Sequence, residues 1–176
     1  MSKMFRRAII TLTLGVSLFT LVNPPGRAQS FRDHLTEQET EAVRLNQDLD
    51  KRTAVFVKAA DRRLLVLSDP AGAAAKIPKK ELELYGPLPT GTRAQLLNDL
   101  AGILDEASDK IDDVAERDEA NPLLMKSLKK LNEAAVRYLP QLKAIAETAK
   151  ANDEKSAAGR AAESAQVIIE AAKRHG

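Results

Sequence analysis

Apolar residues recur every three or four positions through the second half of the chain, and this spacing constrains the fold most. Residues at such intervals share one face of an α-helix. An unbroken alternation of three and four is a heptad repeat, which predicts a long helix packed along its length against others. The longest such seam lies in residues 122–150 and consists of Leu124, Leu128, Leu131, Ala135, Tyr138, Leu142, Ile145 and Ala149.

Two further segments repeat the scheme. One runs from Thr92 to about Arg117 and the other from about Asp153 to Lys173. Their seams consist of Leu97, Leu100, Leu104, Ala107, Ile111 and Val114 in the first, and Ala158, Ala161, Ala165, Ile168 and Ala172 in the second. Small side chains in the last seam allow helix axes to approach closely, so we expect that helix to lie flush against its neighbour.

Capping signals indicate where helices begin. Thr36 with Glu39, and Thr92 with Gln95, have the spacing of capping boxes, in which each side chain bonds the other residue's backbone N–H. The first box predicts a short helix that ends near Asp48.

Two more helix starts follow from single residues. Asp50 is typical of an N-cap and predicts a helix from Lys51 to about Leu67, apolar on most sides and therefore central in a bundle. Asn121 followed by Pro122 predicts the start of the longest heptad helix.

Residues 69–91 hold four of the eight prolines and three of the eight glycines, which predicts one long connection with a single turn at Lys79–Leu84. Together these features predict an all-α protein, an antiparallel up-and-down bundle of four or five helices with heptad seams. We expect residues 29–176 to form a single domain.

Opposite charges indicate which helices pair. Residues 99–120 carry a net charge of −7 and residues 122–150 a net charge of +4. The sequence therefore predicts that these two helices form an antiparallel hairpin with complementary flanks.

The first 28 residues have the order of a secretory signal peptide. Lys3, Arg6 and Arg7 precede the uncharged run 8–22, and Gly26-Arg27-Ala28 places small residues before a cut at Gln29. An uncleaved membrane anchor is the alternative, although fifteen apolar residues fall short of the roughly 20 that span a bilayer. We expect an exported protein, periplasmic or extracellular, without stable membrane insertion after cleavage.

Charge and composition exclude several function classes. Without its first 28 residues the chain has 23 basic and 25 acidic side chains, which argues against nucleic-acid binding. The absence of cysteine excludes disulfides and cysteine-ligated metal centres. Neither a Gly-x-Ser-x-Gly nucleophile motif nor a glycine-rich phosphate loop occurs. We therefore predict a protein that is not an enzyme and needs no cofactor.

A run of acidic residues on the predicted helix from Thr92 to about Arg117 suggests an alternative function, in which the protein binds a cation or another ligand. Its members lie three or four positions apart, so several share a helix face and could gather a hard cation. They are Asp105, Asp109, Asp112, Asp113 and Glu116. Gly102 and Gly159 lie within predicted helices, where glycine is unfavourable. They indicate close helix approach, with a notch that faces a ligand as the alternative.

Two resemblances bear on function. Leu35-Thr36-Glu37-Gln38-Glu39 resembles the Leu-Thr-x-x-Gln motif of the small helical periplasmic stress chaperones, with Glu39 in place of the last glutamine. The stretch 35–64 and the heptad hairpin look like a group of uncharacterised secreted bacterial helical proteins, which implies no particular activity. From the regular helical surfaces we predict an interaction protein, chaperone-like in the cell envelope, with a protein partner or a second copy bound.

Overall fold

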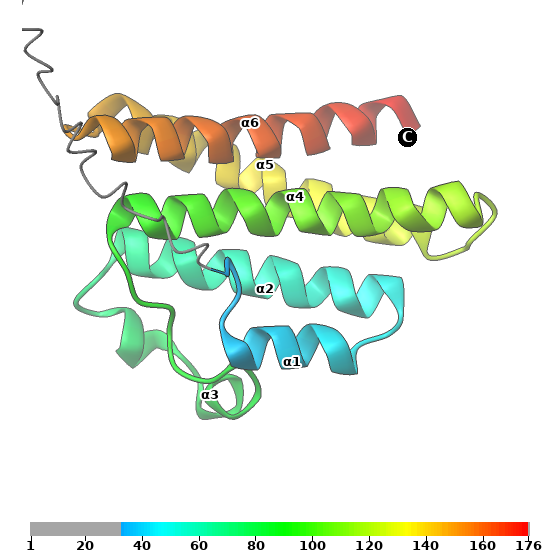
Figure 1. Ribbon diagram of the computed structural model, residues 1–176, viewed down its shortest axis with the longest axis horizontal. Helices are drawn as coiled ribbons and strands as arrows, with labels where there is room; N and C mark the ends of the chain where they lie inside the picture. The colour runs from blue at the N-terminus through cyan, green and yellow to red at the C-terminus, as the bar shows by residue number, and fades with distance from the viewer. Residues whose placement is uncertain (1–32, 176) are drawn as a thin grey trace, which may run out of the picture. The chain divides into compact units, whose positions relative to one another are not determined.

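Helices make up almost all the regular structure of the computed structural model, which describes residues 33–175 (Figure 1). Their bounds are α1 Glu37–Leu45, α2 Leu49–Ser68, α3 Lys79–Tyr85, α4 Arg93–Arg117, α5 Leu124–Thr148 and α6 Asn152–His175, with a 3₁₀ turn at Ala73–Lys76. The described residues contain no strand, so the all-α prediction is confirmed. The predicted signal peptide, residues 1–28, lies outside the described residues.

Both capping boxes form as predicted. The Thr36 hydroxyl accepts from the Glu39 N–H at 3.2 Å, and the Glu39 carboxylate accepts from the Thr36 N–H at 2.9 Å. Thr92 and Gln95 make the equivalent pair of bonds at the start of α4. Local sequence therefore determines these two helix starts.

The prediction that Asp50 caps the second helix is wrong. That helix begins at Leu49 with Asp48 as its N-cap residue. The Asp50 carboxylate instead lies 2.6 Å from the Lys126 ammonium of α5, and this bond holds the pKa of Asp50 below its usual value. The Asp50 side chain, which the sequence predicted to cap the helix, therefore forms an ion pair with another helix instead.

The predicted start at Asn121 is early by a few residues. The Asn121 side chain accepts from the Leu123 N–H at 3.0 Å, in the manner of a cap, but Pro122 and Leu123 form a turn. The helix begins at Leu124. Asn121 thus caps a turn that precedes α5, and not the first turn of the helix itself.

The four long helices, α2, α4, α5 and α6, alternate in direction along the chain, and consecutive helices differ in how extensively they pack against each other (Figure 1). α6 packs against both α4 and α5, and α2 packs on their other side, again against both. α4 runs parallel to α6, since Arg93 bonds Glu154 near the start of each helix. The arrangement differs from the expected hairpin, because α4 and α5 pack more closely against α6 than against each other.

Two cations of α5 form ion pairs with α2. Lys126 contacts Asp50, and Arg137 lies 3.6 Å from Asp61. Tyr138, which is buried, donates its hydroxyl to Asp61 at 2.6 Å, and burial raises the pKa of this phenol. The charges of α5 therefore set its register against α2, whereas the sequence predicted register against α4.

The residues of the predicted seams lie mainly in the core. The buried stripe is nevertheless wider than a heptad seam, because α4 also buries Ala94, Leu96, Ala101 and Ile103. On α6 the first part of the stripe is alanine, with Ala157, Ala158, Ala161 and Ala165 all inaccessible to solvent, and Ile168 and Ile169 continue it. The small alanine side chains bring α6 close to both α4 and α5.

The two helical glycines differ in their surroundings. A Cβ on Gly102 would lie 3.0 Å from Cγ of His34, so this glycine makes room for a side chain that precedes α1. A Cβ on Gly159 would meet nothing within 4 Å. The prediction that both glycines permit close helix approach is therefore wrong.

Replacing Gly159 by alanine is expected to raise the free energy of unfolding by about 0.5 to 1 kcal/mol, because alanine is the better helix former and the site is open. Gly102→Ala is the matched control and should gain less, since its methyl group presses on His34. Urea unfolding followed by circular dichroism measures both. A Gly159→Ala protein less stable than the parent would contradict the expectation.

Candidate functional site

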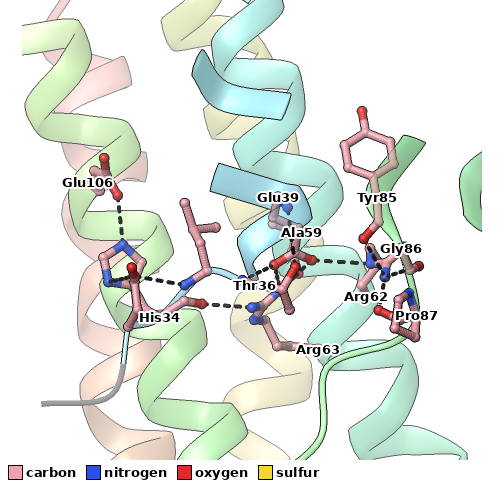
Figure 2. A network of polar contacts seen from close by, with 12 residues as sticks. His34, Thr36, Glu39, Ala59, Arg62, Arg63, Tyr85, Gly86, Pro87 and Glu106 are labelled. Atoms are coloured by element: carbon pink, nitrogen blue, oxygen red, sulfur yellow. Dashed lines mark hydrogen bonds and ion pairs between the residues drawn. The ribbon is translucent and has the colours of Figure 1, made fainter. Parts of the chain in front are cut away.

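A buried charge cluster joins α1, α2 and the long connection (Figure 2). Glu39 of α1 is inaccessible to solvent, and Arg62 and Arg63 of α2 are each 1% exposed. The Glu39 carboxylate lies 3.2 Å from Arg62 Nε and 2.8 Å from Arg63 Nη1. Buried charges are costly unless they are paired, so this shared carboxylate ties α1 firmly to α2.

Arg62 also holds the end of α3. Its Nη2 atom donates to the backbone carbonyls of Tyr85 at 3.3 Å, Gly86 at 2.9 Å and Pro87 at 2.5 Å. The guanidinium lies 5.8 Å from the centre of the Tyr85 ring. Gly86 has a φ of +68°, a conformation that favours glycine, and a Cβ there would meet Gln38 of α1 at 2.9 Å. Arg62 therefore fixes the point where α3 touches α1.

Arg63 holds the segment that leads into α1. It donates to the His34 carbonyl at 2.7 Å and to the Ala59 carbonyl at 2.9 Å. The His34 ring in turn lies 2.7 Å from the Glu106 carboxylate of α4 (Figure 2). The ring also lies next to Gly102, where an added Cβ would be 3.0 Å from its Cγ atom. The start of α1 is thus anchored to α2 and α4 together.

The cluster is balanced by a second carboxylate. Glu81 of α3 lies 3.6 Å from Arg62 Nη1 and 3.2 Å from Lys58 Nζ. Each buried arginine therefore has a carboxylate nearby, and both donate to backbone carbonyls. Nε and Nη1 of Arg62 have only these ion pairs and, like Nε of Arg63, make no hydrogen bond within residues 33–175. The charged groups are paired with one another, which is typical of a structural network that positions helices.

The helices held by this cluster form an open groove of about 1190 Å³ between α1 and α3. On the outer side of α2, these two short helices lie next to each other (Figure 1). The apolar lining of the groove comes from Leu35, Ala42, Leu45, Leu84 and Tyr85. Leu45 is 67% exposed and Leu84 57% exposed, so two large apolar side chains in this groove face water.

The remaining lining of the groove is polar and acidic. Its charged members are Asp33, Glu37, Glu41 and Glu83, and among residues 33–175 no lysine, arginine or histidine lines it. Glu41 accepts two bonds from Arg44, at 2.6 and 2.7 Å, which lower the pKa of this carboxyl. An apolar groove with an acidic rim is a surface that can accept an apolar segment carrying positive charge.

The acidic side chains that the sequence proposed as a cation site do not converge. No group of three or more histidine, cysteine, aspartate or glutamate side chains within residues 33–175 could hold a metal ion. Asp105 lines a separate shallow cleft of about 480 Å³ between α4 and α6, where Arg160 bonds Asn98. Asp113 lies 3.9 Å from Lys110 of its own helix. Asp109, Asp112 and Glu116 are exposed or partly exposed on α4.

Sequence reasoning missed both the groove and the arginines beneath it. Arg62 and Arg63 are adjacent charges in a helix that is otherwise apolar on most sides. Such a pair indicates buried partners, because an arginine on a core-facing surface needs a carboxylate or carbonyl. The sequence therefore contained a signal for the buried charge cluster. It contained no signal for the groove, because the groove depends on how α3 packs against α1.

Comparisons with protein-family models, with curated proteins and with solved structures found no match for this chain. Among the described residues, no helix combines the length and apolar character that crossing a bilayer requires. The function of this chain must therefore be inferred from the chemistry of the site itself.

Proposed function

We propose that this protein is exported and acts by binding another polypeptide, without catalysis, through the groove between α1 and α3. The observation that carries this proposal is the exposure of Leu45 and Leu84 in one groove. Exposed apolar surface rimmed by polar residues is typical of protein interaction sites. The specific form of the proposal is chaperone-like, in which the groove holds an apolar segment of a client.

The rest of the fold supports this assignment. In this proposal the heptad seams of the long helices serve internal packing, because most of their residues are buried. The charged side chains beneath the groove bond one another and backbone carbonyls, so they hold the groove in shape. A groove between two helices is suited to a third helix, which lays its apolar face along the floor.

Export is tested by the mass of the protein recovered from a bacterial host. The proposal predicts a chain that begins at Gln29, found in the periplasm or the medium. Intact-mass spectrometry of each fraction measures this. A cytoplasmic protein that keeps residues 1–28 would contradict the export proposal and leave the groove unaffected.

Binding is tested with an uncharged amphipathic peptide of about 14 residues, or four helical turns, whose leucines form one stripe and whose other positions are glutamine and alanine. Fluorescence anisotropy of the labelled peptide measures its affinity for the protein as isolated from the cell. Changing Leu45 and Leu84 together to serine is expected to weaken binding about tenfold or more, because burying each leucine contributes about 1.5 to 3 kcal/mol.

Val136→Ser is the matched control, since this valine is 53% exposed on α5, away from the groove. It should leave the affinity unchanged. Both variants alter exposed residues, so circular dichroism should show the parental helix content. Absence of peptide binding, or equal binding by the double-serine variant, would refute the proposed site.

A further inference from the structure

We infer that the partner segment is a short amphipathic helix with lysine or arginine on both sides of its apolar stripe. This inference rests on the proposed function and names the chemistry of the partner. It is carried by the charge of the groove, because the four charged side chains among its described lining residues are all acidic.

The acidic residues come from both sides of the groove. Glu37 lies in the first turn of α1 and Glu83 lies in α3. Within residues 33–175 neither carboxylate forms an ion pair, whereas Glu41 is paired with Arg44. A bound segment with positive charge on each flank would therefore meet one carboxylate of α1 and one of α3.

The preference is local to the groove. Residues 29–176 carry 23 basic and 25 acidic side chains, so overall charge attracts a cationic peptide only weakly. Elsewhere on the described surface, some acids pair with bases, as in Asp48 with Lys51 and Asp69 with Lys76. The acidic face of α4 has no exposed leucine beside it, because every leucine of α4 is buried. An acidic rim without basic residues next to exposed leucines thus distinguishes this groove.

The size of the groove sets the length of the segment. α1 has nine residues, so its axis is about 13.5 Å long at 1.5 Å per residue. A helix lying along α1 would present two to three turns, with apolar side chains at intervals of three and four. Lysines next to that stripe keep their charged ends in water at the rim while their stems cover the leucines.

The test compares three peptides that share one leucine stripe and differ only at the flanking positions, which carry lysine, glutamine or glutamate. At about 0.01 M salt, we expect the lysine peptide to bind about tenfold more tightly than the glutamate peptide, with the glutamine peptide between them. Raising the salt to about 0.5 M should remove most of this difference, because exposed charges are then screened. Anisotropy titrations measure all three affinities.

Two charge variants locate the preference. Glu37→Gln with Glu83→Gln should reduce the lysine-to-glutamate affinity ratio to about twofold, with little change for the glutamine peptide. Glu119→Gln with Glu147→Gln removes the same charge from exposed sites in the α4–α5 turn and on α5, and should leave the ratio unchanged.

The outcomes separate this inference from the proposed function. Equal affinity for the three peptides, or a preference for glutamate, would refute the basic partner and leave the binding groove standing. A lysine preference that survives in the Glu37, Glu83 variant would place the selectivity elsewhere and also refute it. Failure of all three peptides to bind would refute both. A concentration-dependent dimer that the double-serine variant abolishes would show that a second copy fills the groove, and would overturn the inference.

Discussion

Replacing Glu39 by glutamine is expected to lower the free energy of unfolding by about 3 to 5 kcal/mol. Glutamine keeps the size of the side chain and can still complete the capping box with Thr36. It removes the single negative charge that Arg62 and Arg63 share at 3.2 and 2.8 Å. Both guanidinium groups would then remain buried without that carboxylate. A buried charge that has lost its partner destabilises the folded state strongly.

Urea unfolding followed by circular dichroism measures this loss at neutral pH. Glu37→Gln is the matched control, because Glu37 is exposed in the same first turn and its change should cost less than about 0.5 kcal/mol. A Glu39→Gln protein within about 1 kcal/mol of the parent would mean that the buried arginines find other partners, contrary to this account.

Leu104→Ala is expected to destabilise the protein by about 2 to 5 kcal/mol. Leu104 is inaccessible to solvent in the middle of α4, the helix that packs against both α2 and α6. Truncation loses the transfer free energy of the removed carbons and leaves a cavity that rigid neighbouring helices fill only in part.

The same unfolding measurement tests this prediction. Met125→Ala is the control, since Met125 is 51% exposed on α5 and its truncation should change the stability by less than about 0.5 kcal/mol. If the two variants lost similar stability, Leu104 would not lie in the core that the fold places around it.

Local features of the sequence predicted the helices well, because their causes are local. Hydrogen bonds within four residues form the Thr36 and Thr92 capping boxes, and apolar periodicity identifies a buried helix face without knowledge of the partner. The prediction for Asp50 was wrong for the opposite reason, whereas the start predicted at Asn121 was early by a few residues. Asp50 bonds Lys126, which lies far away in the chain, and no neighbouring residue indicates this.

Charge patterning was less informative about packing. Opposite charges on the segments 99–120 and 122–150 predicted a hairpin between them, yet both helices pack more closely on α6. Burial of apolar area outweighs exposed ion pairs, each of which contributes at most about 1 kcal/mol. The alanine stripe of α6 allows closer approach and therefore determines which helices are neighbours.

The candidate site depended on tertiary structure. The acidic run from Asp105 to Glu116 was visible in the sequence, but its side chains do not converge into a group of ligands. The groove was invisible because Leu45 and Leu84 belong to helices that are separated in the chain by α2 and a turn. They line one groove because α3 packs against α1, and Arg62 supports this packing by binding the carbonyls that end α3 and the Glu39 carboxylate of α1.

By itself, the sequence determined that this chain is helical, where several of its helices begin and which of their faces are apolar. Those properties follow from hydrogen bonds and side-chain spacing within one or two turns. Tertiary structure decided which helices are neighbours, which charges are buried together and where a groove remains open. Those properties depend on contacts between distant residues, whose energies are set by how closely the helices pack.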